Sequence, residues 1–447
     1  MIKLRLIEST WPKFRSTIGN TGRSVFSGPD GGSAKWKVKI GSGLKEPAIG
    51  SEGTIYIPTD TKLTAIDSSG DILWVKEIYG FRDKPLKCMT TPAVREDGSM
   101  IVGSLSRVTC LEPDGTERWF HTIDGIPAAP NIGPDGTIYV SAWSFDWAGM
   151  YVISPDGEPT GKDDPKIFDK WSAQRHTEVS PASIDSKGNV FIAFHANYTH
   201  PEAYTWDPPD EVDEDLFYAV SIFNREGDRI GKFVPYTFNA STHNLNSVCI
   251  HEDVIYYQGG PFGDLYVFSL EDLLSLEVPT DKLFLKDFYF YESTMNSDKI
   301  RREWISETFE KCKWIWHHAY NGGCEIIGYP VIGDDSSVFA RTICRRSSSK
   351  TNPSTKRIDR FWLSGDGPEN GLISNTMNLE DRIACNPALD SKNRLYLGST
   401  KGKIFMVDSE SGSSILADVE KKVSSIIIGP DKSIIALTSN GYAYCIE

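Results

Sequence analysis

The sequence lacks several features that would assign it to a function class. It has no apolar run near the roughly 18 residues that a membrane-spanning helix needs, and residues 1–7 are too short and too charged for a signal peptide. Basic residues are outnumbered, 47 against 61 acidic ones, which gives a net charge of −14. We therefore expect a cytoplasmic protein with no membrane insertion and no nucleic-acid partner, since nucleic acids and anionic membranes need a basic surface.

Sharp catalytic and metal-binding motifs are also missing. There is no G-x-S-x-G, H-E-x-x-H or P-loop pattern. His317 and His318 would point about 100° apart on a helix, so they cannot easily share one ion. The acidic stretch 207–215 lacks the spacing of an EF-hand. We expect no cofactor and no bound metal.

The cysteines add little chemistry. All eight are scattered, and none are adjacent or spaced as C-x-x-C. Cys110 and Cys445 align with Ala65, a small residue within a predicted strand. Both are therefore expected to be buried, reduced thiols.

A short repeat is what the sequence does contain. The pattern Gly, three residues, Trp, three residues, Ile occurs three times, as Gly32, Trp36 and Ile40, as Gly70, Trp74 and Ile78, and as Gly115, Trp119 and Ile123. Identical spacing indicates a repeat architecture. Short β-rich runs bounded by Gly and Asp-Gly turns predict hairpins within each unit.

Aligning the apolar residue that ends the first strand of each unit gives eight units. The aligned positions are Ile49, Val94, Ile132, Ile184, Ile250, Ile332, Leu389 and Ile428. Four strands per unit at this spacing predict an all-β, eight-bladed β-propeller that forms one domain over residues 1–447. Because the chain ends after a third strand, the N-terminal strand 32–40 is expected to close the last blade.

The repeat resembles that of PQQ-like (quinoprotein-type) β-propellers with a tryptophan-docking motif. The resemblance rests on Ala65, Asp67, Gly70 and Trp74, on turns such as 135–139, and on the opening Trp11, Phe14, Arg15, Asn20 and Gly22. It implies a closed ring whose centre is reached from one face. Quinone enzymes of this kind typically add adjacent cysteines, an acidic Ca²⁺ set and an export signal. Since these are not recognisable in the sequence, quinone chemistry is not expected.

The extra length falls on one face of the predicted ring. Turns between first and second strands are tight, whereas the connections from second to third strands and between blades are long. Loops on a rigid scaffold commonly carry binding sites. An aromatic-walled recess on the insertion-rich face of blades three to six is therefore one interpretation, and packing of the insertions onto the ring is the other. The candidate binding residues are Trp143, Trp147, Trp171, Trp206, Trp314, Trp316 and His317.

The longest insertion, 277–328, is predicted to contain a helix over about 298–316. An apolar stripe at helical spacing supports this helix: Ile300, Trp304, Ile305, Phe309, Cys312 and Trp316.

Two functions remain open from the sequence. The first is a binding module that holds a protein or a small aromatic or sugar-like ligand. The alternative is an enzyme of the lyase, cyclase or hydrolase type with His and carboxylate acid–base catalysis, for which His176, His195 and His200 are the candidates.

Overall fold

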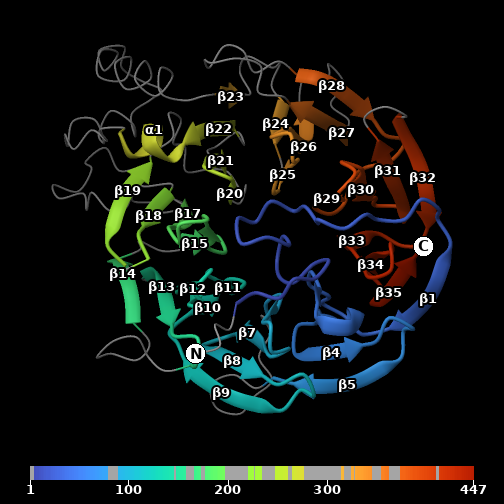
Figure 1. Ribbon diagram of the computed structural model, residues 1–447. Helices are drawn as coiled ribbons and strands as arrows, with labels where there is room; N and C mark the ends of the chain where they lie inside the picture. Colours follow the sequence, from blue (N-terminus) through green and yellow to red (C-terminus); the bar gives the residue numbers. More distant parts are fainter. Residues whose placement is uncertain are drawn as a thin grey trace, which may run out of the picture.

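The computed structural model shows an all-β protein whose strands surround a common centre (Figure 1). One α-helix, α1 (Leu270–Leu274), and one 3-10 turn, η1 (Ser51–Gly53), occur among the described residues. The structure describes residues 5–78, 89–144, 147–157, 166–172, 177–196, 220–225, 227–233, 247–259, 264–275, 314–316, 324–326, 328–344, 354–361, 373–408 and 412–447.

The strands of the described residues form eight antiparallel sheets, which we name A to H in chain order. Sheet A contains β2 (Ala48–Ile49), β3 (Ile55–Pro58), β4 (Lys62–Ile66) and β5 (Ile72–Glu77). Sheet B contains β6 (Ala93–Val94), β7 (Met100–Ser104), β8 (Arg107–Leu111) and β9 (Glu117–Thr122). Sheet E contains β20 (Ser247–His251), β21 (Val254–Gly259), β22 (Asp264–Ser269) and β23 (Trp314–Trp316). Sheet G contains β29 (Ala388–Leu389), β30 (Leu395–Gly398), β31 (Lys403–Asp408) and β32 (Gly412–Asp418).

Sheets C, D and F have an inner strand in two pieces that pair with the same neighbour. Sheet C contains β10 (Ile126–Pro127), β11 (Asn131–Ile132), β12 (Ile138–Trp143), β13 (Trp147–Ile153) and β14 (Lys166–Ser172). Sheet D contains β15 (Thr177–Val179), β16 (Ser183–Ile184), β17 (Val190–Ala196), β18 (Val220–Phe223) and β19 (Arg229–Phe233). Sheet F contains β24 (Cys324–Ile326), β25 (Val331–Ile332), β26 (Val338–Cys344), β27 (Ser354–Phe361) and β28 (Ile373–Asn378).

Sheet H joins the two ends of the described chain. It contains β33 (Val423–Ile428), β34 (Ile434–Thr438), β35 (Tyr442–Ile446) and, as its outer strand, β1 (Ala34–Lys39). Trp36 lies opposite Cys445 in this pairing, and Val38 lies opposite Ala443. The N-terminal strand therefore covers the edge of β35, as the sequence predicted for strand 32–40.

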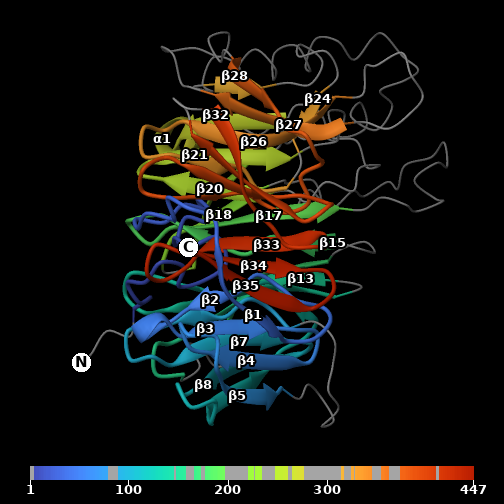
Figure 2. The same ribbon diagram turned by 90° about the vertical axis from the view of Figure 1, so that its right-hand side faces the viewer.

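Apolar cores lie between successive sheets. Ala48 and Val94 share one core between sheets A and B, and Val331 and Leu389 share another between sheets F and G. Ile57 of sheet A packs in the same cluster as residues of sheets G and H. In the view turned by 90°, the strands of successive sheets run in roughly the same direction (Figure 2). Burial of apolar surface between sheets thus holds them in order around the centre.

Three tryptophans on outer strands join one sheet to the next. Trp36 donates from Nε1 to the carbonyl of Ser68 at 2.9 Å, and Trp74 donates to Pro113 at 2.9 Å. A Cβ on Gly70 would lie 2.7 Å from Trp36 Cγ, so only glycine leaves room for the ring. Trp119 also lies against a glycine, Gly157, in the connection between β13 and β14 of sheet C, although its Nε1 has no acceptor among the described residues. The Gly and Trp of the repeat therefore meet between neighbouring units.

The small residues opposite these tryptophans follow the predicted alignment. Ala65 pairs with Trp74, and Cys110 pairs with Trp119. Cys110 and Cys445 are buried free thiols, so that prediction is confirmed. Burial raises the pKa of both thiols, which keeps them protonated near neutral pH.

The helix predicted over 298–316 is wrong at its C-terminal end. Trp314–Trp316 is strand β23, in which Trp316 pairs with Leu265 and Trp314 with Val267. The exposed backbone edge of β22 offers hydrogen bonds that a helical turn at this place could not use. Residues 298–313 lie outside the described residues.

The contact between Trp36 and Gly70 can be tested against a glycine of similar backbone conformation. Gly70 has φ +91°, whereas Gly412 has φ +85° and a Cβ added there would meet no atom within 4 Å. Gly412→Ala should cost only the left-handed strain, about 1–2 kcal/mol. Gly70→Ala should cost about 1–3 kcal/mol more, because the new methyl overlaps the indole. Thermal and urea unfolding of both variants give the comparison, and equal losses would contradict the packing argument.

Candidate functional site

The N-terminal residues 5–33, which we call the central segment, cross the middle of the structure (Figure 1). In six sheets, a backbone carbonyl of this segment accepts a hydrogen bond from a backbone N–H of the inner strand. The donor is the last residue of that strand, or the equivalent residue on β20. The donor and acceptor pairs are Ile49 with Trp11, Val94 with Pro12, Ile184 with Ile18, Ile250 with Gly19, Ile332 with Thr21, and Leu389 with Gly22, at 2.7–3.0 Å. In sheet C, the side chain of Asn131 donates from Nδ2 to Ile18 O at 2.7 Å.

These donors coincide with the positions that aligned the repeat in the sequence. Most of them stand directly before the tight turn between first and second strands; Ile49, for example, precedes a turn closed by a bond from Gly50 N to Thr54 O. The central segment therefore lies at the tight-turn end of the sheets. It satisfies backbone donors that face the centre and would otherwise be unpaired.

Side chains of the central segment make further buried bonds. The Lys13 ammonium donates to the carbonyls of Phe14 and Thr17, at 2.6 and 3.0 Å, and to the side chain of Asn20. Asn20 in turn donates to Ala182 O at 3.1 Å. Fully buried Lys13 thus has three acceptors, and the segment is joined to sheet D.

Arg15 and Glu46 are two further charged residues beside Lys13. Arg15 donates from Nη1 to Pro387 O at 2.7 Å and from Nη2 to Pro330 O at 2.8 Å. The Glu46 carboxylate accepts from Arg15 N at 2.7 Å and from Trp11 Nε1 at 3.0 Å. Arg15 therefore joins sheets F and G, and Glu46 fixes the segment to sheet A.

Burial shifts the pKa values of Lys13 and Glu46. Burial lowers the pKa of Lys13 to about 7, and the Glu46 carboxylate only partly opposes the shift. Burial also raises the pKa of Glu46, against the attraction of Arg15. The three groups are one interacting set in which desolvation outweighs ion pairing.

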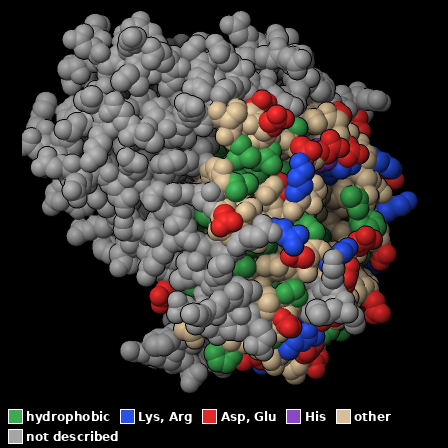
Figure 3. All heavy atoms as spheres, turned by 60° about the vertical axis from the view of Figure 1, so that its left-hand side comes forward, with side chains coloured by type: hydrophobic (Ala, Val, Ile, Leu, Met, Phe, Trp, Pro, Cys, Tyr) green, Lys and Arg blue, Asp and Glu red, His purple; other side chains and the backbone are tan. Residues whose placement is uncertain are grey.

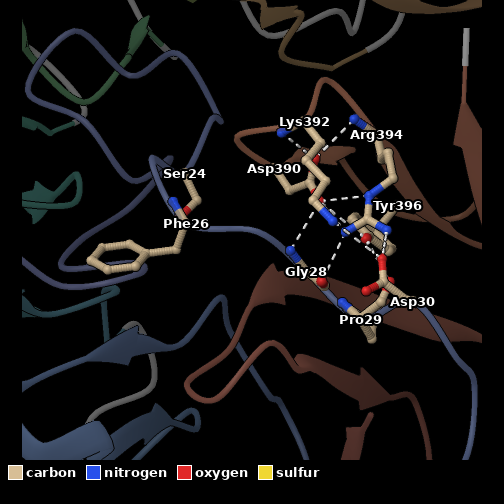
Figure 4. A network of polar contacts seen from close by, with 9 residues as sticks. All are labelled: Ser24, Phe26, Gly28, Pro29, Asp30, Asp390, Lys392, Arg394 and Tyr396. Atoms are coloured by element: carbon tan, nitrogen blue, oxygen red, sulfur yellow. Dashed lines mark hydrogen bonds and ion pairs between the residues drawn. The ribbon is translucent and has the colours of Figure 1, made fainter.

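A second polar network holds the end of the central segment on sheet G (Figure 4). The buried carboxylate of Asp390 accepts from Arg394 Nη2 at 2.7 Å and from Gly28 N at 2.9 Å. Arg394 also pairs with Asp30 and donates to Gly28 O at 2.8 Å. The Phe26 side chain points away from this network and is 44% exposed.

The sequence candidates divide between described and undescribed residues. Trp143 ends β12, and its partly buried side chain packs against the core cluster between sheets C and D that includes Tyr139, Met150 and Val179. The other described candidates are placed by backbone register, as pairs of Trp147 with Ser172, Trp171 with Ala148, Trp314 with Val267, Trp316 with Leu265, and His195 with Glu178. Trp206, His176, His200 and His317 lie outside the described residues.

Most of the described candidates share one position in the fold. Trp143 and Trp147 flank the connection between second and third strands of sheet C. His195 precedes the corresponding connection of sheet D, and Trp316 pairs beside that of sheet E. These strand ends lie opposite the end that the central segment occupies.

Neither a metal cluster nor a membrane-spanning helix occurs in the described part of the chain. Within the described ranges, no group of three His, Cys, Asp or Glu side chains could hold a metal ion. No helix among the same residues is long and apolar enough to cross a membrane. On the face in Figure 3, Lys and Arg side chains lie among Asp and Glu over the described part.

Sequence reasoning did not find the buried charges at the centre. The opening motif included Lys13, Arg15 and Asn20, but Glu46, Asp390 and Arg394 gave no local signal. Arg394 stands four residues after Asp390, and its other acceptors lie 364 to 366 residues away in the chain. Only tertiary contacts reveal such a network.

The low pKa of Lys13 predicts a pH dependence of stability. Its folded pKa of about 7 lies below the ordinary lysine value of 10.5, so the unfolded chain binds more protons between these values. The free energy of unfolding should therefore rise with pH from about 7 to about 10, by at most about 1.4 kcal/mol per pH unit. Lys13→Met should remove this rise, whereas Lys76→Met on the outer strand β5 should keep it. Urea unfolding at several pH values measures it, and identical slopes for Lys13→Met and the unaltered chain would refute the assignment.

Comparison with known proteins is informative at the level of fold. Neither a protein-family model nor a curated protein matches the sequence. The quinohemoprotein alcohol dehydrogenase from Comamonas testosteroni is similar in structure, with TM-score 0.62 and 11% identity over 99% of this chain and 81% of that one. BamB from Moraxella catarrhalis gives TM-score 0.56 and 10% identity over 93% and 99%. Sqt1 of Saccharomyces cerevisiae gives TM-score 0.58 and 9% identity over 94% and 98%. The chain thus has a β-propeller fold like those of BamB and the quinoprotein dehydrogenases, as the repeat predicted.

Proposed function

We propose that sheets A to H are the blades of a closed, eight-bladed PQQ-like propeller with tryptophan docking. The contacts of Trp36, Trp74 and Trp119 with glycine turns of the next sheet support this interpretation. The pairing of β1 with β35 supports closure by the N-terminal strand. The core that sheet A shares with sheet H supports a complete ring.

We further propose that this propeller is a cytoplasmic binding module. It holds a protein, or a small aromatic or sugar-like ligand, on the insertion-bearing face of sheets C to F. The observation that carries the proposal is the position of the central segment. Because its carbonyls and buried side chains are committed to bonds with the sheets at the tight-turn end, the opposite face is left for recognition.

The candidate aromatic residues support the same face. Trp147, Trp171 and Trp316 belong to strands β13, β14 and β23, at ends away from the central segment. Indole rings provide large contact areas at low entropic cost, which suits recognition of apolar and planar groups. Trp143 contributes by packing sheet C against sheet D beneath this face.

The structural similarities do not distinguish a binding module from an enzyme. One is named as an alcohol dehydrogenase, and others are named as BamB or Sqt1. Propellers host unrelated activities, so function has to be argued from the site. The net charge of −14 favours a partner other than nucleic acid.

An acid–base enzyme is the second candidate. The register that pairs His195 of β17 with Glu178 of β15 favours it. A histidine and a carboxylate at one strand end are suitable partners for proton transfer.

Native mass spectrometry of the protein purified from its own host tests the binding module. Trp147→Ala, Trp206→Ala and Trp316→Ala together should abolish a co-purifying protein or small mass while the thermal unfolding temperature stays close to its original value. Phe26→Ala with Phe120→Ala is the matched control, since both rings are exposed, at 44% and 50%, and lie away from the proposed face.

Three results would decide between the interpretations. Loss of the partner in the triple variant and its retention in the control support the binding face. Unfolding of the triple variant shows that the tryptophans pack the fold, and the proposal then fails. A retained small mass that is released by His195→Gln, with the triple variant unaffected, favours the enzyme.

A further inference from the structure

Arg341 lies on β26 of sheet F, near the border with sheet G. It pairs through its backbone with Ile358 of β27. On its other side the inner strand is interrupted between β24 and β25, where Gly328 has φ +73°. A Cβ on Gly328 would lie 3.6 Å from Arg341 Nη2 and would overlap Asn386. One nitrogen of the guanidinium therefore lies close to this break in the inner strand.

Within the described residues, the buried Nε of Arg341 has no hydrogen-bond acceptor. Burial lowers the pKa of Arg341, and only the Cys385 thiol opposes the shift. A cation that is largely enclosed and has no acceptor is costly, and native structures rarely keep one without a use.

A second arginine stands at the same border. Arg15 joins Pro330 O of sheet F to Pro387 O of sheet G, and the bond from Tyr329 N to Asn386 Oδ1 lies at the same border. Both guanidiniums act on Cys385. Glu46 is the one carboxylate among the charged groups that act on this thiol, so this border is locally positive in a chain of net charge −14.

The position of Arg341 indicates the direction of approach. The central segment occupies the tight-turn end, where β26 begins at Val338. Arg341 comes three residues later, toward the connection between second and third strands. Its side chain is partly exposed, although Nε is enclosed. The central segment thus occupies the opposite end of sheet F from the strand end toward which Arg341 lies.

We propose that Arg341 binds a small oxyanion, a carboxylate or a phosphate, at the border of sheets F and G. The planar guanidinium offers paired N–H donors that match the oxygens of these groups. The positive charge of Arg15 nearby strengthens the attraction for an anion. The site does not depend on the protein-binding proposal, because a small anion can occupy it in the free protein.

Stability measurements on the full chain test this site. Thermal unfolding is followed at constant ionic strength while chloride is replaced by inorganic phosphate in one series and by malonate in another. The unfolding temperature of the unaltered chain should rise with the concentration of the bound anion. Arg341→Met should start at a higher unfolding temperature in chloride, since the unpaired charge is gone, and should lose the anion-dependent rise. In calorimetric titrations its affinity for the anion should fall about tenfold or more.

Two variants serve as controls. Lys76→Met removes one positive charge on outer strand β5 and should keep the full anion response. Arg341→Lys keeps the charge without the planar donors and should respond less than the unaltered chain. A response to phosphate alone or to malonate alone identifies the group that is bound.

Two results would overturn the proposal. If Arg341→Met is less stable in chloride and the unaltered chain ignores both anions, Arg341 is structural. If Arg341→Met and the unaltered chain respond equally, the anions act elsewhere. In both cases the binding module proposed above is untouched, because its test uses other residues and other ligands.

Discussion

The fold depends on one set of backbone hydrogen bonds, those from the inner strand ends to the central segment. At these strand ends the donor residue lies at or next to the point where the strand turns away, and its N–H bonds to the central segment instead of to its own sheet. Carbonyls from Trp11 to Gly22 accept these bonds in six sheets. A single stretch of chain thereby fixes strands as far apart in the sequence as β2 and β29. The side chains of Lys13, Arg15 and Asn20 in this stretch are buried as well.

Side-chain packing joins neighbouring sheets both near the centre and at the periphery. Inner and middle strands bury aliphatic side chains between neighbours, as in the clusters around Ile57 and Leu389. Outer strands use Trp36, Trp74 and Trp119, each placed on a glycine turn of the next sheet. The glycine has a left-handed backbone and no Cβ, so the indole can lie directly on the turn. Neighbouring sheets are therefore fixed at the periphery as well as at the centre.

The buried charges differ in how many hydrogen bonds offset their burial. Lys13 has three acceptors, and Arg15 has two carbonyls and the field of Glu46. Arg394 donates to the carboxylate of Asp390, which also accepts from the backbone N–H of Gly28. Arg341 differs, because burial is not offset by any bond in the described structure. Such a site gives up stability for the ability to bind an anion, a common compromise at functional positions.

The sequence by itself determined the repeat, the strands near it and the small residues opposite the tryptophans, because these follow from local spacing and turn chemistry. The alignment at Ile49, Val94 and Leu389 even marked the donors that meet the central segment. Only the tertiary structure decided that Trp314–Trp316 is a strand, since an apolar stripe fits a helix until an edge such as β22 offers its hydrogen bonds. Tertiary structure also decided the partners of Glu46 and Arg394 and the isolation of Arg341, because burial and charge balance depend on groups hundreds of residues apart.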